Sequence, residues 1–193
     1  MNPPKSLIFE WPQPPPLPPL NQAVLIRVAT SSARKIARQE LRIVLRQTLT
    51  EWSGILPEQL PLEETPRGPK WRGELAGHPL DVSLTYCEDE GWIGLLRGGA
   101  IGIDMMLVKP IVEAEEVARH YLGPEVLADI QYSKNPARAF ALAWTSLEAR
   151  LKCLRLNLAE WSKIQNAMRQ NQVTQSIVAD TCRIVTVATI FCG

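Results

Sequence analysis

The sequence predicts an α+β protein, in which helices and strands follow one another without a regular alternation. Apolar residues spaced three and four apart over residues 33–52 and 138–156 predict two long amphipathic helices. Short runs rich in Val, Ile and Thr predict strands elsewhere. An apolar content of 46% in 193 residues is sufficient for a core. Because neither Gly-x-Gly-x-x-Gly nor a Walker loop occurs, a doubly wound nucleotide-binding fold is not expected.

Residues 1–20 form a proline-rich segment that is expected to be separate from the core. Half of the 16 prolines of the chain lie here. Proline fixes one backbone angle and lacks the N–H that helices and sheets require, so we expect an arm that is extended or disordered. A polyproline partner motif is the alternative interpretation of the same segment.

Residues 21–105 are expected to form an N-terminal α+β half. Its elements are a strand at 23–29, a helix at 33–52, a connection rich in Pro and Gly at 57–69, and strands at 80–86, 92–97 and 100–105. Gly98 and Gly99 separate the last two strands, and such a pair permits the positive φ angles of a tight hairpin. The sequence therefore predicts that these two strands pair with each other.

Residues 106–193 are expected to form a second α+β half. Short helices are predicted at 111–121 and 124–130, the long helix at 138–156, and a closing hairpin with strands at 176–179 and 183–190. Asn135 and Pro136 suit the cap and first turn of the long helix. Its predicted buried stripe consists of Phe140, Trp144, Leu147, Leu151 and Leu154.

Composition excludes several classes of function. A net charge of +1 argues against a general nucleic-acid-binding surface. No apolar run approaches the roughly 20 residues of a membrane span, and the N-terminus has no signal core, so we expect a cytoplasmic protein without membrane contact. The four cysteines show no metal-binding spacing and are expected to be free thiols. His78 and His120 have no evident catalytic partner.

A ridge of arginines lies along the predicted helix at 33–52. Arg34, Arg38, Arg42 and Arg46 recur every four residues and therefore share one face. The ridge is either a solvated surface or a contact for phosphate, for which the arginine fork is well suited.

Asp104, Glu148 and Lys152 are the candidate chemical residues. Glu148 and Lys152 share one helix face, and Asp104 follows an apolar strand. Two carboxylates can hold Mg²⁺ together with substrate phosphates, while a lysine adds a positive charge for phosphate oxygens. A carboxylate can also accept a proton from an attacking hydroxyl. The simpler alternatives are an ordinary helix ion pair between Glu148 and Lys152 and a turn cap at Asp104.

At these residues the sequence resembles the 4'-phosphopantetheinyl transferase superfamily, in its Sfp-type branch. The family's strand motif, Gly-(Ile/Val)-Asp-x-Glu, corresponds to residues 102–106, Gly-Ile-Asp-Met-Met. Its helix motif, Trp-(Ser/Thr)-x-Lys-Glu-(Ala/Ser)-x-x-Lys, corresponds to residues 144–152, Trp-Thr-Ser-Leu-Glu-Ala-Arg-Leu-Lys. The upstream likeness, at 33–52, 67–70 and 82–87, is weaker, and the resemblance covers about residues 25–190.

The resemblance implies a pseudo-two-fold fold of two similar α+β halves with coenzyme A bound between them. The enzyme, a holo-[acyl-carrier-protein] synthase type transferase, would move phosphopantetheine to a serine of an acyl or peptidyl carrier protein. Asp104 and Glu148 would hold Mg²⁺, Glu148 or a water it orients would act as base, and Lys152 would bind phosphate. Arg34, Arg42 and Lys70 would contact the 3'-phosphate region. Because one chain supplies both halves, a monomer is expected. The carrier is expected to dock near residues 106–136.

Three departures from the family pattern support an alternative. Met106 replaces a second acid, and a thioether is a poor ligand for a hard cation. Leu147 replaces a lysine, and Tyr86 replaces a phosphate-binding histidine. The alternative is a catalytically degenerate family member that acts as a coenzyme A or carrier-protein binding module. A third possibility is an unrelated α+β protein in which Glu148 and Lys152 form only an ordinary ion pair on the surface of one helix.

Overall fold

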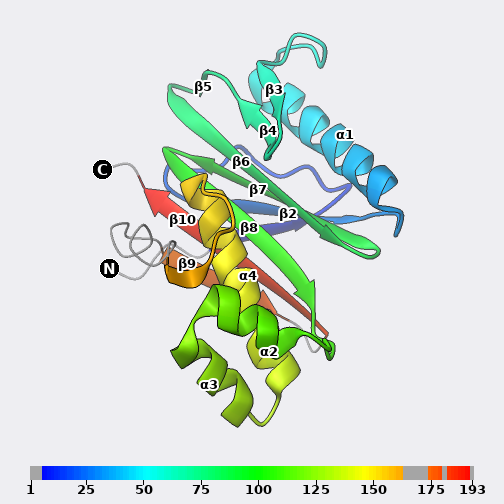
Figure 1. Ribbon diagram of the computed structural model, residues 1–193. Helices are drawn as coiled ribbons and strands as arrows, with labels where there is room; N and C mark the ends of the chain where they lie inside the picture. The colour runs from blue at the N-terminus through cyan, green and yellow to red at the C-terminus, as the bar shows by residue number, and fades with distance from the viewer. Residues whose placement is uncertain (1–5, 163–173, 180–181, 192–193) are drawn as a thin grey trace.

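Two β-sheets, each covered by one long helix, form the framework of the protein (Figure 1). The computed structural model describes residues 6–162, 174–179 and 182–191. Helices and strands follow one another in irregular order, which confirms the predicted α+β class. In the ranges that the structure describes, no helix combines the length and the apolar character needed to cross a bilayer.

The first sheet carries helix α1 (Arg34–Ser53) on one face. Its strands are β1 (Leu7–Glu10), β2 (Val24–Ala29), β5 (Glu74–Leu75), β6 (His78–Cys87) and β7 (Glu90–Arg97), in the spatial order β1-β2-β7-β6-β5. Leu41 and Leu45 of α1 belong to the same buried cluster as Ile26 and Ile93 of the sheet. The helix ends at Gly54, whose φ of 69° is a left-handed conformation that glycine adopts at low cost. Beside this sheet lies the hairpin of β3 (Leu62–Thr65) and β4 (Gly68–Trp71).

The predicted proline-rich arm is held against this first sheet. Residues 7–10 form β1, which pairs in parallel with β2. Further along, the Trp52 indole donates a hydrogen bond to the Pro15 carbonyl at 2.9 Å, and Arg97 donates to the Pro18 carbonyl at 3.0 Å. Because proline keeps its carbonyl while losing its N–H, the arm is the acceptor at these two residues, whereas the Leu7 and Trp11 N–H groups donate to the Ala23 and Arg27 carbonyls.

The second sheet has the order β8-β10-β9 and is antiparallel. Its strands are β8 (Gly99–Leu107), β9 (Thr174–Ala179) and β10 (Arg183–Phe191). The pairing of β9 with β10 confirms the predicted closing hairpin. Leu25 and Trp92 of the first sheet share a buried cluster with Ile103 and Val187 of the second, so the two sheets pack on each other.

The predicted hairpin around Gly98 and Gly99 is wrong, because the two strands belong to different sheets. β7 pairs with β2 and β6, whereas β8 pairs with β10. Gly98 turns the chain with a φ of 77°. At Gly99, an added Cβ would lie 2.3 Å from the Ile190 carbonyl oxygen, so only glycine allows β10 to lie this close. The glycine pair therefore connects two sheets.

Helix α4 (Pro136–Leu154) covers the second sheet. Its start confirms the predicted cap, since the Asn135 side chain accepts a hydrogen bond from the Arg138 N–H at 3.0 Å. Before it come α2 (Ala114–Val117), the short π-helical turn η1 (Ala118–Leu122) and α3 (Pro124–Tyr132). These segments form a separate cluster with Phe140, Leu147 and Leu151 of α4. A long helix packed on a sheet thus occurs twice in the chain, and the second sheet begins with β8, before the predicted boundary at residue 106.

Candidate functional site

The two sheets meet along β6 and β8, which are joined by side chains and not by a backbone ladder. Three β8 residues, Ile101, Ile103 and Met105, direct their N–H groups away from β10. The first donates to Asp81 at 2.8 Å and the second to the Ser83 hydroxyl at 3.0 Å. The third donates to the Thr85 hydroxyl at 3.2 Å. We call these three hydrogen bonds the β6–β8 seam. It satisfies the buried edge of β8 while keeping the two strands a side chain apart.

Asp104 projects from β8 beside this seam and is anchored by two neighbours. The ammonium of Lys152 donates to its Oδ1 atom at 2.7 Å, and the Thr85 hydroxyl lies 3.4 Å from the same atom. Lys152 also donates to the Ile103 carbonyl at 2.9 Å. The aspartate is therefore not a turn cap, because it lies within β8, is largely buried and is paired with a helix residue.

Helix α4 can reach β8 only because residue 102 is glycine. An added Cβ at Gly102 would lie 2.0 Å from the Ala149 carbonyl oxygen and 2.4 Å from the Cys153 nitrogen. A second contact fixes the helix one turn earlier, where the buried hydroxyls of Thr145 and Thr186 lie 2.8 Å apart. Thr186 is the β10 partner of Asp104 in the sheet register. These contacts set the position of Glu148 and Lys152 relative to Asp104.

Burial dominates the electrostatics of the two carboxylates. It raises the pKa of Asp104 above the usual aspartate value, although the nearby Lys152 ammonium acts in the opposite direction. Burial also raises the pKa of Glu148, and repulsion from the Asp104 carboxylate raises it further. This repulsion means that the two groups are close enough to affect one another. A bound cation would favour the ionised form of both.

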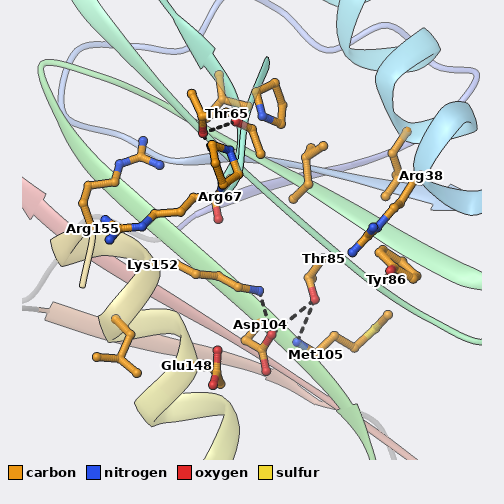
Figure 2. A pocket seen from close by; sticks show the side chains of 18 of the residues that line it. Arg38, Thr65, Arg67, Thr85, Tyr86, Asp104, Met105, Glu148, Lys152 and Arg155 are labelled. Carbon is orange, nitrogen blue, oxygen red and sulfur yellow. Dashed lines mark hydrogen bonds and ion pairs between the residues drawn. The ribbon is translucent and has the colours of Figure 1, made fainter. Parts of the chain in front are cut away.

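A cavity of about 600 Å³ lies over the β6–β8 seam, between the two halves (Figure 2). Asp104, Glu148 and Lys152 all line it, and Figure 2 shows them together at its floor. Three of the predicted arginines, Arg34, Arg38 and Arg42, line it from α1. The structure thus brings the candidate residues of both halves to one cavity.

Of the predicted phosphate contacts on α1, the two arginines are already engaged within the protein. Arg34 donates to the Tyr86 hydroxyl at 2.8 Å. The guanidinium of Arg42 forks onto the Glu64 carboxylate at 2.8 and 2.9 Å. Between them, Arg38 lies over the Tyr86 ring, 5.7 Å from its centroid, in a cation–π contact. Lys70 lies on β4 and is not part of the cavity lining, although its neighbours Gly68 and Pro69 are.

Two departures from the family motifs have a structural explanation. Leu147 is buried in the cluster that α4 makes with η1 and α3, so this side chain supports the helix packing. Met106 packs against the same cluster and does not line the cavity. Neither side chain therefore occupies space that a ligand of this cavity requires.

Arg67, Arg155 and the β6–β8 seam were not identified as site features in the sequence. Arg67 sits at the tip of the β3–β4 hairpin, and Arg155 follows the last turn of α4. In the sequence, Arg67 belongs only to a turn with a weak likeness to the family, and Arg155 is only an arginine near a helix end. The hydroxyls of the seam look like ordinary strand residues in sequence, because the partner strand of β6 is not apparent.

The carboxylate pair fits a divalent cation of the magnesium type. Within the described ranges, no group of three or more His, Cys, Asp or Glu side chains is arranged to hold a metal ion. A pair of carboxylates beside cationic side chains is nevertheless the donor set that Mg²⁺ uses when water and substrate phosphates complete its shell. Asp104 and Glu148 supply oxygen ligands, and they come from different elements that the Gly102 contact holds together.

Comparisons with known proteins identify the same C-terminal motifs. Residues 100–190, which include Asp104, Glu148 and Lys152, match the family model of the 4'-phosphopantetheinyl transferase superfamily. A protein of Synechocystis sp. that is provisionally named a 4'-phosphopantetheinyl transferase is 25% identical to this chain over 158 residues. That match covers 77% of this chain and 64% of the length of the relative. Over its residues 100–190, the chain is therefore similar to the 4'-phosphopantetheinyl transferase superfamily.

Proposed function

We propose that the protein transfers the 4'-phosphopantetheine arm of coenzyme A to a serine of an acyl or peptidyl carrier protein. The observation that carries the proposal is the meeting of Asp104, Glu148 and Lys152, from both family motifs, in one cavity between the two halves. The cavity lining contains six cationic side chains and two carboxylates among the described residues, which suits a polyanionic substrate. The transferase name of the Synechocystis relative points to the same reaction class.

Each residue of the cavity would have a separate role in phosphoryl transfer. Asp104 and Glu148 would hold Mg²⁺, which supplies charge neutralisation at the pyrophosphate when bound. Lys152 would donate to a phosphate oxygen and, by its bond to Asp104, keep that carboxylate in position. Glu148, or a water it orients, would accept the proton of the carrier serine as that oxygen attacks the β-phosphorus. Adenosine 3',5'-bisphosphate would leave.

Glu148 suits the role of base better than Asp104. Burial raises the pKa of both carboxylates, so their neighbours make the difference. The Asp104 carboxylate accepts a hydrogen bond from the Lys152 ammonium at 2.7 Å, and this ion pair makes Asp104 the weaker proton acceptor. The roles of Arg34, Arg42 and Lys70 at the 3'-phosphate rest on the resemblance alone.

The carrier would approach from the side of α2 and α3. A groove of about 960 Å³ lies there, lined by residues of α2, η1, α3 and the start of α4. Val112 in its lining is 97% exposed, and nearby Tyr132 is 89% exposed. Apolar side chains so exposed offer contacts for a partner helix. Carrier affinity unchanged by charge reversal at Lys109, Arg119 and Lys134 would contradict this placement.

The proposal is tested by intact-mass spectrometry of an apo carrier protein incubated with this protein, coenzyme A and Mg²⁺. We expect a mass gain of one phosphopantetheine arm, and we expect Glu148→Gln to abolish it. Glu51→Gln, which changes an exposed acid of α1 outside the cavity and the groove, is the matched control and should retain full activity. If coenzyme A binds but no carrier gains mass, the degenerate binding module is the better description.

A further inference from the structure

The proline-rich arm crosses the body of the protein in an extended segment, residues 14–19, that belongs to no helix or strand. This segment contains only proline and leucine. Its side chains therefore make neither ion pairs nor hydrogen bonds, and it can be held only by apolar contacts and by its own carbonyl groups. The sequence alone allows either a plain arm or a partner motif for this segment, and the structure adds the contacts that decide what it does.

Burial along the segment repeats every three residues. Pro15 and Pro18, which we call the inward prolines, are buried, whereas Pro16 and Pro19, the outward prolines, are exposed. A polyproline II helix has three residues per turn, so residues three apart share one face. Proline also fixes φ close to the value that this helix requires. The segment thus presents one face to the body and another to solvent, as a bound polyproline II ligand does.

Two side chains of the body donate hydrogen bonds to the inward face. The Trp52 indole donates to the Pro15 carbonyl at 2.9 Å. The Arg97 guanidinium donates to the Pro18 carbonyl at 3.0 Å. The two acceptors are one turn of polyproline II apart, about 9 Å along the helix. Trp52 lies in the last turn of α1 and Arg97 ends β7, so donors with this spacing exist only in the folded protein.

Both donors are also held by contacts outside the arm. Trp52 packs against the hydrophobic cluster of the first sheet, where Leu17 of the arm packs as well. The Arg97 guanidinium donates a second hydrogen bond, to the Ala76 carbonyl at 3.3 Å. An aromatic side chain beside a hydrophobic surface, with fixed donors for main-chain carbonyls, is the kind of surface on which proline-rich ligands dock.

The end of the segment lies against the link between the two sheets. Asn21 donates its N–H to the Arg97 carbonyl at 3.0 Å, where β7 ends. At Gly98, the next residue, an added Cβ would lie 2.6 Å from the Leu20 Cδ1 atom. The arm therefore covers the point at which the chain leaves the first sheet for β8.

We propose that Trp52 and Arg97 form a recognition site for a polyproline II segment, and that the chain's own residues 14–19 occupy this site in cis. The inference is independent of the transferase reaction. A ligand that is tethered to its site has a local concentration in about the millimolar range, so the arm keeps the site closed to proline-rich segments of other molecules. The outward prolines remain exposed and do not contribute to this recognition.

The test weakens the arm in the full-length protein and then supplies the arm sequence as a separate peptide. The opened variant, Pro15→Ala with Pro18→Ala, changes the inward prolines and keeps both donors. By fluorescence anisotropy, a dye-labelled peptide of residues 12–20 should bind this variant at least about tenfold more tightly than the wild type, whose own arm competes. Pro16→Ala with Pro19→Ala is the matched control, and it should exclude the peptide as the wild type does.

The two donors are tested in the opened variant. Trp52→Phe keeps an aromatic ring but removes the N–H, and it should weaken peptide binding about fivefold, the usual effect of one hydrogen bond. Arg97→Gln should have a similar effect, and it gives the answer if Trp52→Phe does not fold. A peptide with alanine in place of the outward prolines should bind within about twofold of the parent peptide, because that face is solvated.

Several results would overturn the proposal. A peptide that binds the wild type and the opened variant equally shows that the arm does not fill the site, and a peptide that binds neither shows that there is no such site. Unchanged affinity in both Trp52→Phe and Arg97→Gln shows that these side chains do not recognise the segment. A wild-type dimer in sedimentation that becomes monomeric in the opened variant shows that a second copy, and not the same chain, supplies the arm.

Discussion

Replacing Gly102 with alanine should separate α4 from β8 and disable the site. The added Cβ would lie 2.0 Å from the Ala149 carbonyl oxygen, whereas ordinary contacts of this kind exceed 3 Å. The obstructing atoms belong to the helix backbone, so no side-chain rotation can relieve the clash. Helix α4 must therefore withdraw by about 1 Å, at a cost near the upper end of overpacking effects, about 3 kcal/mol.

A withdrawal of this size also breaks the central ion pair. The Lys152 ammonium lies 2.7 Å from Asp104 Oδ1 in the structure, and an added ångström takes the pair beyond hydrogen-bond distance. Misplacement of catalytic groups by about 1 Å reduces rates by about 100-fold. We therefore expect Gly102→Ala to lose about 3 kcal/mol of unfolding free energy in urea and about 100-fold in transfer rate.

Gly91→Ala is the matched control for this experiment. Its Cβ would meet the terminal methyl groups of Leu41, the nearest at 2.8 Å, and these can move. We expect a loss of about 1 kcal/mol and a transfer rate within about threefold of the wild type. A Gly102→Ala protein with wild-type stability and rate would refute the close approach of α4 to β8.

Three further predictions follow from the site and its supports. Thr85→Val leaves the buried Met105 N–H without its acceptor and should cost about 1 to 3 kcal/mol in urea unfolding, whereas Thr85→Ser should restore most of the loss. Because burial and Asp104 raise the pKa of Glu148, its ionisation disfavours the folded state, and stability should fall as pH rises from the ordinary glutamate pKa through the raised folded value. Glu148→Gln should reduce this fall, while the raised pKa of Asp104 keeps part of it. The substitution should also remove the stabilisation by Mg²⁺, which for the wild type is about 2.7 kcal/mol at 100 times the dissociation constant. Melting curves against pH and Mg²⁺ that match the wild type would contradict both expectations. Asn135→Ala should lower the unfolding free energy by about 1 kcal/mol through loss of the α4 cap, and a changed coenzyme A affinity would show that the effect reaches the cavity.

The residues at the floor of the cavity could be predicted because each of them belongs to a short pattern of neighbouring residues. Glu148 and Lys152 are one helical turn apart, and Asp104 lies in an apolar strand. The Asn135 cap and the pairing of β9 with β10 also follow from short-range signals. Helical spacing and capping depend on neighbours within a few residues, so one sequence is sufficient to find them.

The parts that could not be predicted depend on which strands become neighbours. The Gly98 and Gly99 pair is typical of a hairpin, yet it connects two sheets, because β8 finds its partner in β10. The β6–β8 seam exists only once those sheets are packed. Arg155 has the left-handed backbone that a glycine would predict, and its partner Asp81 is 74 residues away. Long-range packing decides each of these features, and local patterns do not encode it.

The most direct test of the account measures the Mg²⁺ dependence of the transfer rate in four proteins: wild type, Asp104→Asn, Glu148→Gln and the double variant. If the two carboxylates hold one ion, either substitution should destroy most of the Mg²⁺-dependent rate, and the double variant should be little slower than the slower single variant. Losses that multiply in the double variant would show that Asp104 and Glu148 act independently, which would contradict a shared metal site.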